Sequence, residues 1–228
     1  MWHPPGALAC AGHGRGSAIG ALGTLGTLGT IGTIGMTSFS LCVYCGSRPG
    51  ARPAYTAAAK QLGHSIGERG WQLVYGGGRA GLMGVVADAA LASGARVVGV
   101  IPESLMRLEV GHASLSELHV VQTMHQRKTL MAERSDAFVA LPGGIGTFEE
   151  LFEVWTWRHL GYHSRPVGLL EVDGYWSGLL AFLRQTEVEG FISANQMAML
   201  QVSDQIDVLL DALSAPGGAG PASDFGRV

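Results

Sequence analysis

Hydrophobic residues between Ser38 and Leu213 alternate between short apolar runs and longer segments with a helical pattern. The apolar runs are residues 39–45, 71–75, 95–101, 118–122, 136–142 and 166–172, and the helical segments are residues 54–70, 81–94, 124–135, 146–161 and 175–190. The runs lack the strict alternation of half-exposed strands, as expected when helices cover both faces of a sheet. The pattern therefore predicts an α/β fold with a doubly wound parallel sheet in a single domain, residues 37–213.

The two ends of the chain differ from this pattern. Residues 20–35 repeat a Gly-Thr-apolar triplet without a charged residue. Glycine at every third position costs a helix roughly 1 kcal/mol each relative to alanine, which argues against a membrane span, and a signal peptide would need a continuous apolar region. We expect residues 1–36 to be a disordered low-complexity extension and residues 214–228 a flexible tail. A second hypothesis is that translation begins at Met36, just before the first strand.

Composition narrows the classes of function. A length of 228 residues provides one sizeable core, and 14% charged with 47% hydrophobic residues fits a compact domain. A formal net charge of −3 gives no reason to expect nucleic acid as a partner, and we expect no membrane partner. Three cysteines do not make a disulfide framework, so a reducing compartment, the cytoplasm, is expected.

Three glycine-rich loops follow predicted strands: residues 45–50, 76–84 and 142–147. The carboxyl ends of parallel strands share one edge of the sheet, where ligands bind. The sequence GGGRAG, residues 76–81, matches the dinucleotide fingerprint, with Glu103 near the position of the required acidic residue. That fingerprint is expected after the first strand, however, and a dinucleotide leaves PGGIGTFEE, residues 142–150, unexplained.

The segment PGGIGTFEE combines glycines with two glutamates. Its glycines can expose backbone N–H groups to a phosphate at the start of a helix, and Thr147 can cap that helix or offer a hydroxyl. Glu149 and Glu150 would stabilise the first helical turn, or one of them would contact ribose hydroxyls and a water molecule. A phosphate and a sugar on one molecule would explain both residue types, so the predicted ligand is a nucleotide.

Other candidate residues lie outside the glycine loops. Arg127 and Lys128 of MHQRK fall at the same sheet edge, which favours a role in binding an anion over a solvated helix face. Cys42 and Cys45 form a C-x-x-C pair along a strand and are expected to be buried, since redox pairs begin helices. No metal site is predicted.

The motifs GGGRAGLMG, MHQRK and PGGIGTFEE, in this order and spacing, closely resemble those of the Lonely Guy (LOG) family of cytokinin riboside 5′-monophosphate phosphoribohydrolases, also called lysine decarboxylase-like proteins. The similarity runs from about Phe39 to Leu213. It implies a Rossmann-like homodimer without metal or redox cofactor. Its reaction would hydrolyse the N-glycosidic bond of N6-modified adenosine 5′-monophosphates, releasing the free base and ribose 5-phosphate.

The resemblance also implies roles for individual residues. Arg127 and Glu150 would be the catalytic pair. The predicted substrate-binding residues, from the motifs and the glycine loops, are Gly46, Ser47, Gly77, Gly78, Glu109, Lys128, Gly143, Gly144, Ile145, Gly146, Thr147, Phe148, Glu149 and Thr156. Ile145 stands where the family commonly has tyrosine. A carboxylate near C1′ would stabilise the oxocarbenium-like transition state or activate water, and Arg127 would hold Glu150 ionised or bind phosphate.

Several alternatives remain open at this stage. A general AMP or nucleoside-monophosphate glycosidase would use the same residues. A non-catalytic nucleotide-cofactor binding protein would keep the glycine loops but not the Arg–Glu pair. A NAD-dependent oxidoreductase and a pyridoxal-phosphate lysine decarboxylase rank lower, the latter because the chain has only two lysines, Lys60 and Lys128.

Overall fold

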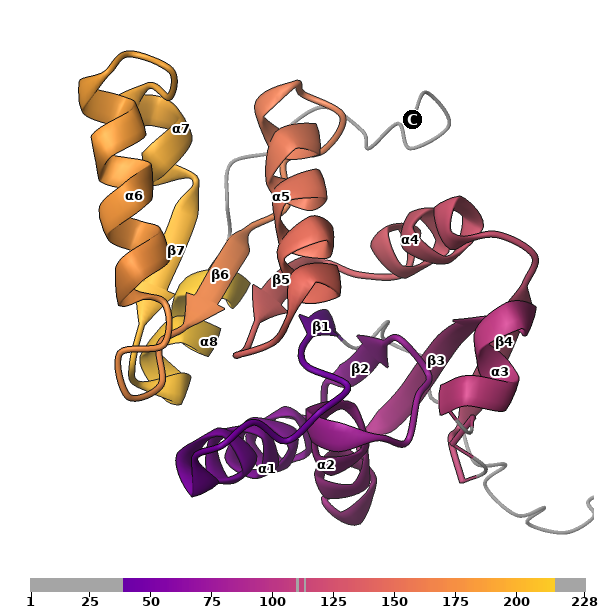
Figure 1. Cartoon of the computed structure of the whole chain (residues 1–228). Helices are drawn as coiled ribbons and strands as arrows, with labels where there is room; N and C mark the ends of the chain where they lie inside the picture. Colours follow the sequence, from indigo (N-terminus) through magenta and orange to yellow (C-terminus); the bar gives the residue numbers. More distant parts are fainter. Residues whose placement is uncertain (1–38, 110, 113, 216–228) are drawn as a thin grey trace, which may run out of the picture. The chain divides into compact units, whose positions relative to one another are not determined.

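The computed structural model of the chain describes residues 39–109, 111–112 and 114–215. The expected extension, residues 1–36, and nearly all of the expected tail, residues 214–228, lie outside them. In the described part, seven parallel strands form one sheet with the order β4-β3-β2-β1-β5-β6-β7 (Figure 1). The strands are β1 Ser40–Tyr44, β2 Gln72–Tyr75, β3 Arg96–Pro102, β4 Glu117–Val121, β5 Ala137–Ala140, β6 Val167–Leu170 and β7 Leu200–Ser203.

Helices cover both faces of this sheet (Figure 1). They are α1 Pro53–Glu68, α2 Gly81–Ala92, α3 Glu103–Glu109, α4 Met124–Glu133, α5 Ile145–His159, α6 Ser177–Val188, α7 Ala194–Ala198 and α8 Ile206–Ser214. One core layer joins α1, α2 and α8 to the sheet, and the other joins α4, α5 and α6 to it. The predicted doubly wound α/β fold is confirmed.

The central strand β1 shows why the apolar runs do not alternate. Leu41 and Val43 belong to the core layer under α1 and α2, whereas Cys42 and Tyr44 belong to the layer under α5. All four side chains are buried. A strand that is buried on both faces reads as a continuous apolar run.

The order of the strands places a topological switch point beside β1. β1 pairs with β2 on one side and with β5 on the other, where Leu41 is in register with Ala137. The chain therefore winds outward in both directions from β1. In open α/β sheets the crevice at such a point, beyond the carboxyl ends of the strands, is the preferred place for a ligand.

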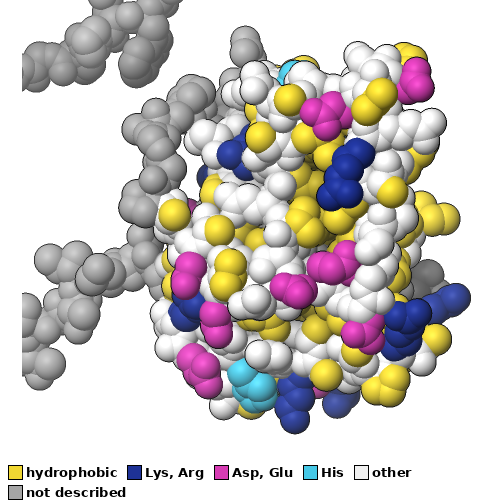
Figure 2. All heavy atoms as spheres, turned by 90° about the vertical axis from the view of Figure 1, so that its left-hand side faces the viewer, with side chains coloured by type: hydrophobic (Ala, Val, Ile, Leu, Met, Phe, Trp, Pro, Cys, Tyr) yellow, Lys and Arg dark blue, Asp and Glu magenta, His cyan; other side chains and the backbone are white. Residues whose placement is uncertain are grey.

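The six predicted strands correspond to β1–β6, but the sequence reading missed the last strand. β7 has a single buried residue, Leu200, and forms one edge of the sheet. Figure 2 views this end of the domain, where hydrophobic side chains lie among charged ones. The exposed hydrophobic residues there include Phe182 and Val188 of α6, Phe191 and Val202.

Candidate functional site

The three glycine-rich loops meet backbone to backbone at the switch point. The N–H of Gly46 donates to the carbonyl of Pro142 at 3.1 Å, and the carbonyl of Gly46 accepts from the N–H of Leu82 at 3.0 Å. A Cβ atom on Gly46 would lie 3.3 Å from the Cα of Gly143, and one on Gly81 would lie 2.3 Å from the backbone of Arg48. These glycines therefore allow the loops to interlock.

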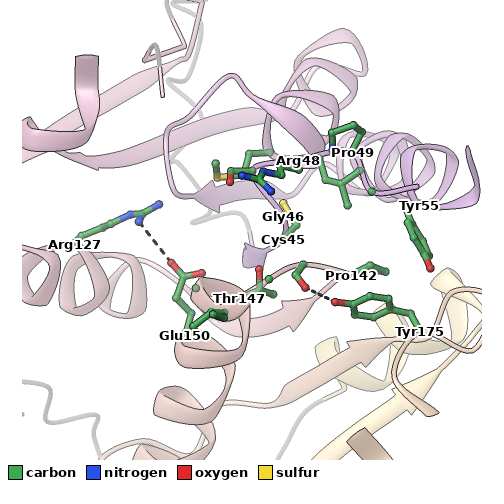
Figure 3. Close-up of a pocket in the computed structure, with 18 residues that line it drawn as sticks. Cys45, Gly46, Arg48, Pro49, Tyr55, Arg127, Pro142, Thr147, Glu150 and Tyr175 are labelled. Atoms are coloured by element: carbon green, nitrogen blue, oxygen red, sulfur yellow. Dashed lines mark hydrogen bonds and ion pairs between the residues drawn. The ribbon is translucent and has the colours of Figure 1, made fainter. Parts of the chain in front are cut away.

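A cavity of about 410 Å³ opens where the loops meet (Figure 3). Its residues come from the loops after β1 and β5, from the starts of α1, α2, α4 and α5, and from the segment between β6 and α6. They are Cys45, Gly46, Ser47, Arg48, Pro49, Gly50, Tyr55, Leu82, Met83, Arg127, Pro142, Gly143, Gly144, Ile145, Gly146, Thr147, Glu150 and Tyr175. Volume and position are those of a small-molecule site.

Arg127 is fixed in the wall of this cavity. Thr123 caps α4 with a complete capping box, which places Arg127 in the first turn of the helix. Its Nε donates to the carbonyl of Val100 and its Nη2 to the carbonyl of Gly76, both at 3.1 Å. The side chain is buried. The hydrogen bonds to these two carbonyl groups offset part of the free energy that is lost when the guanidinium is removed from water, and they hold it in one orientation.

Glu150 faces Arg127 across the cavity (Figure 3). Its Oε1 lies 3.8 Å from Nη1 of Arg127, and both side chains are about nine-tenths buried. Glu150 stands in the second turn of α5, on the side of the helix that faces the sheet, next to the buried Leu151. The two opposite charges are thus brought together in the interior of the site, where their attraction is little screened.

The N-terminus of α5 forms the floor of the cavity. Its N-cap residue, Gly144, has no side chain to satisfy the first N–H groups of the helix. A Cβ atom on Gly144 or Gly146 would meet nothing within 4 Å, whereas one on Gly143 would lie 2.0 Å from Oγ1 of Thr147. Gly144 and Gly146 therefore leave space beside the helix N-terminus, and this is an arrangement that favours an anion.

Lys128 and Glu149 lie outside the cavity. Nζ of Lys128 donates to Glu149 and, at 2.8 Å, to Oε1 of Glu153. Burial opposes the charge of Lys128, but these two hydrogen bonds outweigh it and raise the pKa of the ammonium group. The structure thus places this predicted pair in a bridge between α4 and α5.

Four further predicted residues, Phe148, Thr156, Gly77 and Gly78, also do not line the cavity. Phe148 packs on Trp176 with ring centroids 5.8 Å apart, and Thr156 is exposed further along α5. The carbonyl of Gly77 accepts from the N–H of His112, and Gly78 forms a bridge with Gly111. Glu109 ends α3, and its side chain lies outside the described residues.

The sequence reading missed several residues of the cavity. Tyr175 donates from its hydroxyl to the carbonyl of Gly143 and packs edge-on against Tyr55, with ring centroids 5.6 Å apart (Figure 3). Leu82 and Met83 provide an apolar wall from α2. Arg48 lies in a loop whose only signal in the sequence is its glycines. The tyrosines come from helix and loop positions far apart in the sequence, so no spacing connects them to the motifs.

The two cysteines of C-x-x-C are free and buried, as predicted. Burial raises the pKa of the Cys42 thiol to about 12, and burial also raises the pKa of Cys45, which lines the cavity. Cys45 therefore remains a thiol at neutral pH and is a poor nucleophile. Among the described residues, no group of three or more His, Cys, Asp or Glu side chains could hold a metal ion. None of the helices in the described ranges has the length and apolar character needed to cross a membrane.

Comparisons with known proteins agree on one family. The family model described as "Possible lysine decarboxylase" matches residues 83–213. A cytokinin riboside 5′-monophosphate phosphoribohydrolase from Rhodococcoides fascians is 49% identical over 181 residues, covering 79% of this chain and 91% of the relative. A protein of the same name from Arabidopsis thaliana is 54% identical, covering 67% of this chain and 70% of the relative.

Solved structures support the fold. The molybdenum cofactor binding protein from Rippkaea orientalis superposes with a TM-score of 0.61 at 20% identity, over 79% of this chain and 98% of that protein. The molybdenum cofactor carrier protein from Chlamydomonas reinhardtii gives 0.58 at 20% identity, over 78% and 99%. At such identities the likeness concerns the fold alone. From the sequence relatives, which confirm the resemblance of the motifs, it follows that the chain belongs to the Lonely Guy family of cytokinin riboside 5′-monophosphate phosphoribohydrolases.

Proposed function

We propose that this protein hydrolyses the N-glycosidic bond of N6-modified adenosine 5′-monophosphates and releases the free base and ribose 5-phosphate. The observation that carries the proposal is the placement of Glu150, with Arg127 beside it, in the same cavity as the N-terminus of α5. One part of the cavity suits a phosphate, and the other presents a carboxylate. A nucleoside 5′-monophosphate has an anionic end and a C1′ atom that becomes positive during cleavage.

The chemistry assigned to Glu150 follows from its surroundings. When the C1′–N bond breaks, its electron pair leaves with the base and the ribose develops oxocarbenium-like charge, which a carboxylate stabilises. The oxygen of a water molecule then bonds to C1′ and its proton passes to Glu150 as general base. The leaving nitrogen takes up a proton, so the balance is nucleotide plus water to base plus ribose 5-phosphate.

Arg127 is assigned a positioning role. Its Nε and Nη2 are engaged by backbone carbonyls, and Nη1 faces Glu150. This arrangement supports holding of the carboxylate rather than free capture of a phosphate. Of the remaining predicted binding residues, Gly46, Ser47 and residues 143–147 line the cavity and are proposed to contact substrate.

The test measures by chromatography the base that is released from isopentenyladenosine 5′-monophosphate and, in a separate reaction, from AMP. Preferential release of isopentenyladenine is the expected result. Equal release from both would indicate a general nucleotide glycosidase, and binding without release would indicate a nucleotide carrier. Glu150→Gln should abolish turnover and leave the fold intact, since glutamine keeps the shape of the side chain. Wild-type turnover in this variant would contradict the assigned mechanism.

We further propose a homodimer and a cytoplasmic location. Support for association comes from large hydrophobic side chains on the α5–α6 side, with Leu160 57% and Phe182 60% exposed. Support for a reducing compartment comes from the two free buried cysteines. Light scattering of the purified protein should give twice the monomer mass, and Phe182→Glu should shift it toward the monomer.

A further inference from the structure

Arg48 is the exposed cation of the cavity. It follows β1 in the loop of residues 46–50 and lies opposite Thr147 and Glu150 of α5 (Figure 3). No hydrogen bond or ion pair to its guanidinium is present within the described ranges 39–109, 111–112 and 114–215. Its backbone, by contrast, lies close to Gly46 and Gly81, where an added Cβ atom would lie 3.0 Å from the carbonyl oxygen of Arg48 and 2.3 Å from its backbone nitrogen, respectively. Among the described residues, Arg48 therefore has a packed backbone and a side chain with no hydrogen-bond or ion-pair partner.

The charges of the cavity indicate what Arg48 can bind. The Arg, Lys, Asp and Glu side chains among the lining residues are Arg48, Arg127 and Glu150. Arg127 and Glu150 face each other, so their formal charges cancel locally. The charge of Arg48 is therefore not balanced within the cavity, and the positive end of α5 adds to it. This distribution of charge favours a ligand that carries one or two negative charges.

We propose that Arg48 is a specificity-determining residue that binds the phosphate of the substrate against the N-terminus of α5. Gly144 and Gly146 leave the space that the phosphate needs, and a planar guanidinium can donate two hydrogen bonds to one phosphate group. Arg48 then makes the protein bind nucleoside 5′-monophosphates more tightly than nucleosides, while Arg127 positions the carboxylate of Glu150. The two arginines of the cavity have separate tasks. This inference rests on the proposed function for the identity of the phosphate's carrier.

The test compares ligands with and without a phosphate. In the Glu150→Gln background, which prevents turnover, calorimetry measures the dissociation constants of AMP, adenosine and ribose 5-phosphate. Arg48→Ala should weaken both phosphate ligands about 10- to 100-fold and change adenosine less than twofold. Arg48→Lys should give an intermediate loss, because a point charge remains but the paired donors do not.

Arg79 offers a matched control. It is also an exposed arginine in a strand-end loop, and it does not line the cavity. Arg79→Ala removes the same charge and should leave all three dissociation constants unchanged. An equal loss in Arg79→Ala, or an equal loss of adenosine and AMP in Arg48→Ala, would overturn the proposal, as would failure of the parent protein to bind ribose 5-phosphate.

The outcome can be separated from that of the proposed reaction. If the wild-type protein releases no base but binds ribose 5-phosphate through Arg48, the reaction is wrong and the anion site stands. If base is released and Arg48→Ala changes neither phosphate ligand, the reaction stands and the role of Arg48 is wrong. Thermal unfolding of each variant, compared with Arg79→Ala, checks that the fold is retained.

Discussion

Gly76→Ala should displace Arg127 without removing its charge. A Cβ atom at position 76 would lie 1.9 Å from Nη2 of Arg127, and contacts to a real Cβ stay above 3.0 Å. The guanidinium must therefore move by about 1.1 Å, the difference between 3.0 and 1.9 Å. Gly76 does not have a positive φ, so alanine fits the backbone there. The end of the arginine side chain is the part that yields.

The size of the effect follows from this shift. Nη2 loses its 3.1 Å hydrogen bond to the carbonyl of Gly76, and the 3.8 Å approach of Nη1 to Glu150 changes with it. A misplacement of about 1 Å in a catalytic arrangement costs about 100-fold in rate, or about 2.7 kcal/mol of transition-state stabilisation. The lost charged hydrogen bond should lower the free energy of unfolding by about 1.5–3 kcal/mol.

The assay is kcat/KM for release of base from the nucleotide, together with thermal unfolding. Gly178→Ala is the control, because that glycine is exposed on α6 and a Cβ atom there meets nothing within 4 Å. Gly178→Ala should keep wild-type activity. If Gly76→Ala also kept wild-type kcat/KM, the reasoning that the position of Arg127 governs the rate would be refuted.

Three further changes test the site and its support. Gly146→Ala should not lower thermal stability, because this position is helical and open, but it should raise KM about 10-fold or more, because its methyl group enters the space beside α5 that the phosphate needs; an unchanged KM would place the phosphate elsewhere. Tyr175→Phe loses the hydrogen bond to the carbonyl of Gly143. It should lower the free energy of unfolding in urea by about 1 kcal/mol and raise KM. Wild-type values of both would show that this hydrogen bond does not hold the loop. Burial lowers the pKa of His163 from 6.5 to about 4. Between these pH values the unfolded chain binds more protons, so urea unfolding should show stability falling by up to about 3 kcal/mol as pH drops from 6.5 to 4. His163→Gln should flatten that slope, and a slope as steep as in the wild type would exclude His163 as its source.

The sequence predicted the central part of the fold because the buried strands are chemically distinct. A strand covered on both faces, such as β1, must be apolar throughout, and this makes it visible without any structure. β7 lies at the edge of the sheet, so only Leu200 is buried, and the run LQVS carries no strong signal. The sequence reading also missed α8, although Ile206, Leu209, Leu210 and Leu213 of this helix are buried in the core layer of α1 and α2.

The candidate site was predictable only in part. Glycines near a strand end indicate a loop that approaches something closely, but not whether the neighbour is a ligand or another loop. The structure separates the two cases: Gly46 and Gly81 face neighbouring backbone, whereas Gly144 and Gly146 face open space. The partner of Lys128 was not visible either, because its bridge to α5 depends on how two helices pack over the sheet.

The interlocked loops also make the cavity a late product of folding. Gly46 joins residues 81–82 to residues 142–143, and β1 pairs with β5, whose partner positions Leu41 and Ala137 are distant in the sequence. A nascent chain that has exposed only β1–β4 lacks the floor of the cavity, so it cannot yet hold a ligand. Contacts of such large sequence separation form slowly. Because the cavity requires residues from both halves of the sheet, a bound nucleotide would stabilise the whole domain against global unfolding. Binding of a nucleotide would show that α5 has been synthesised and has folded.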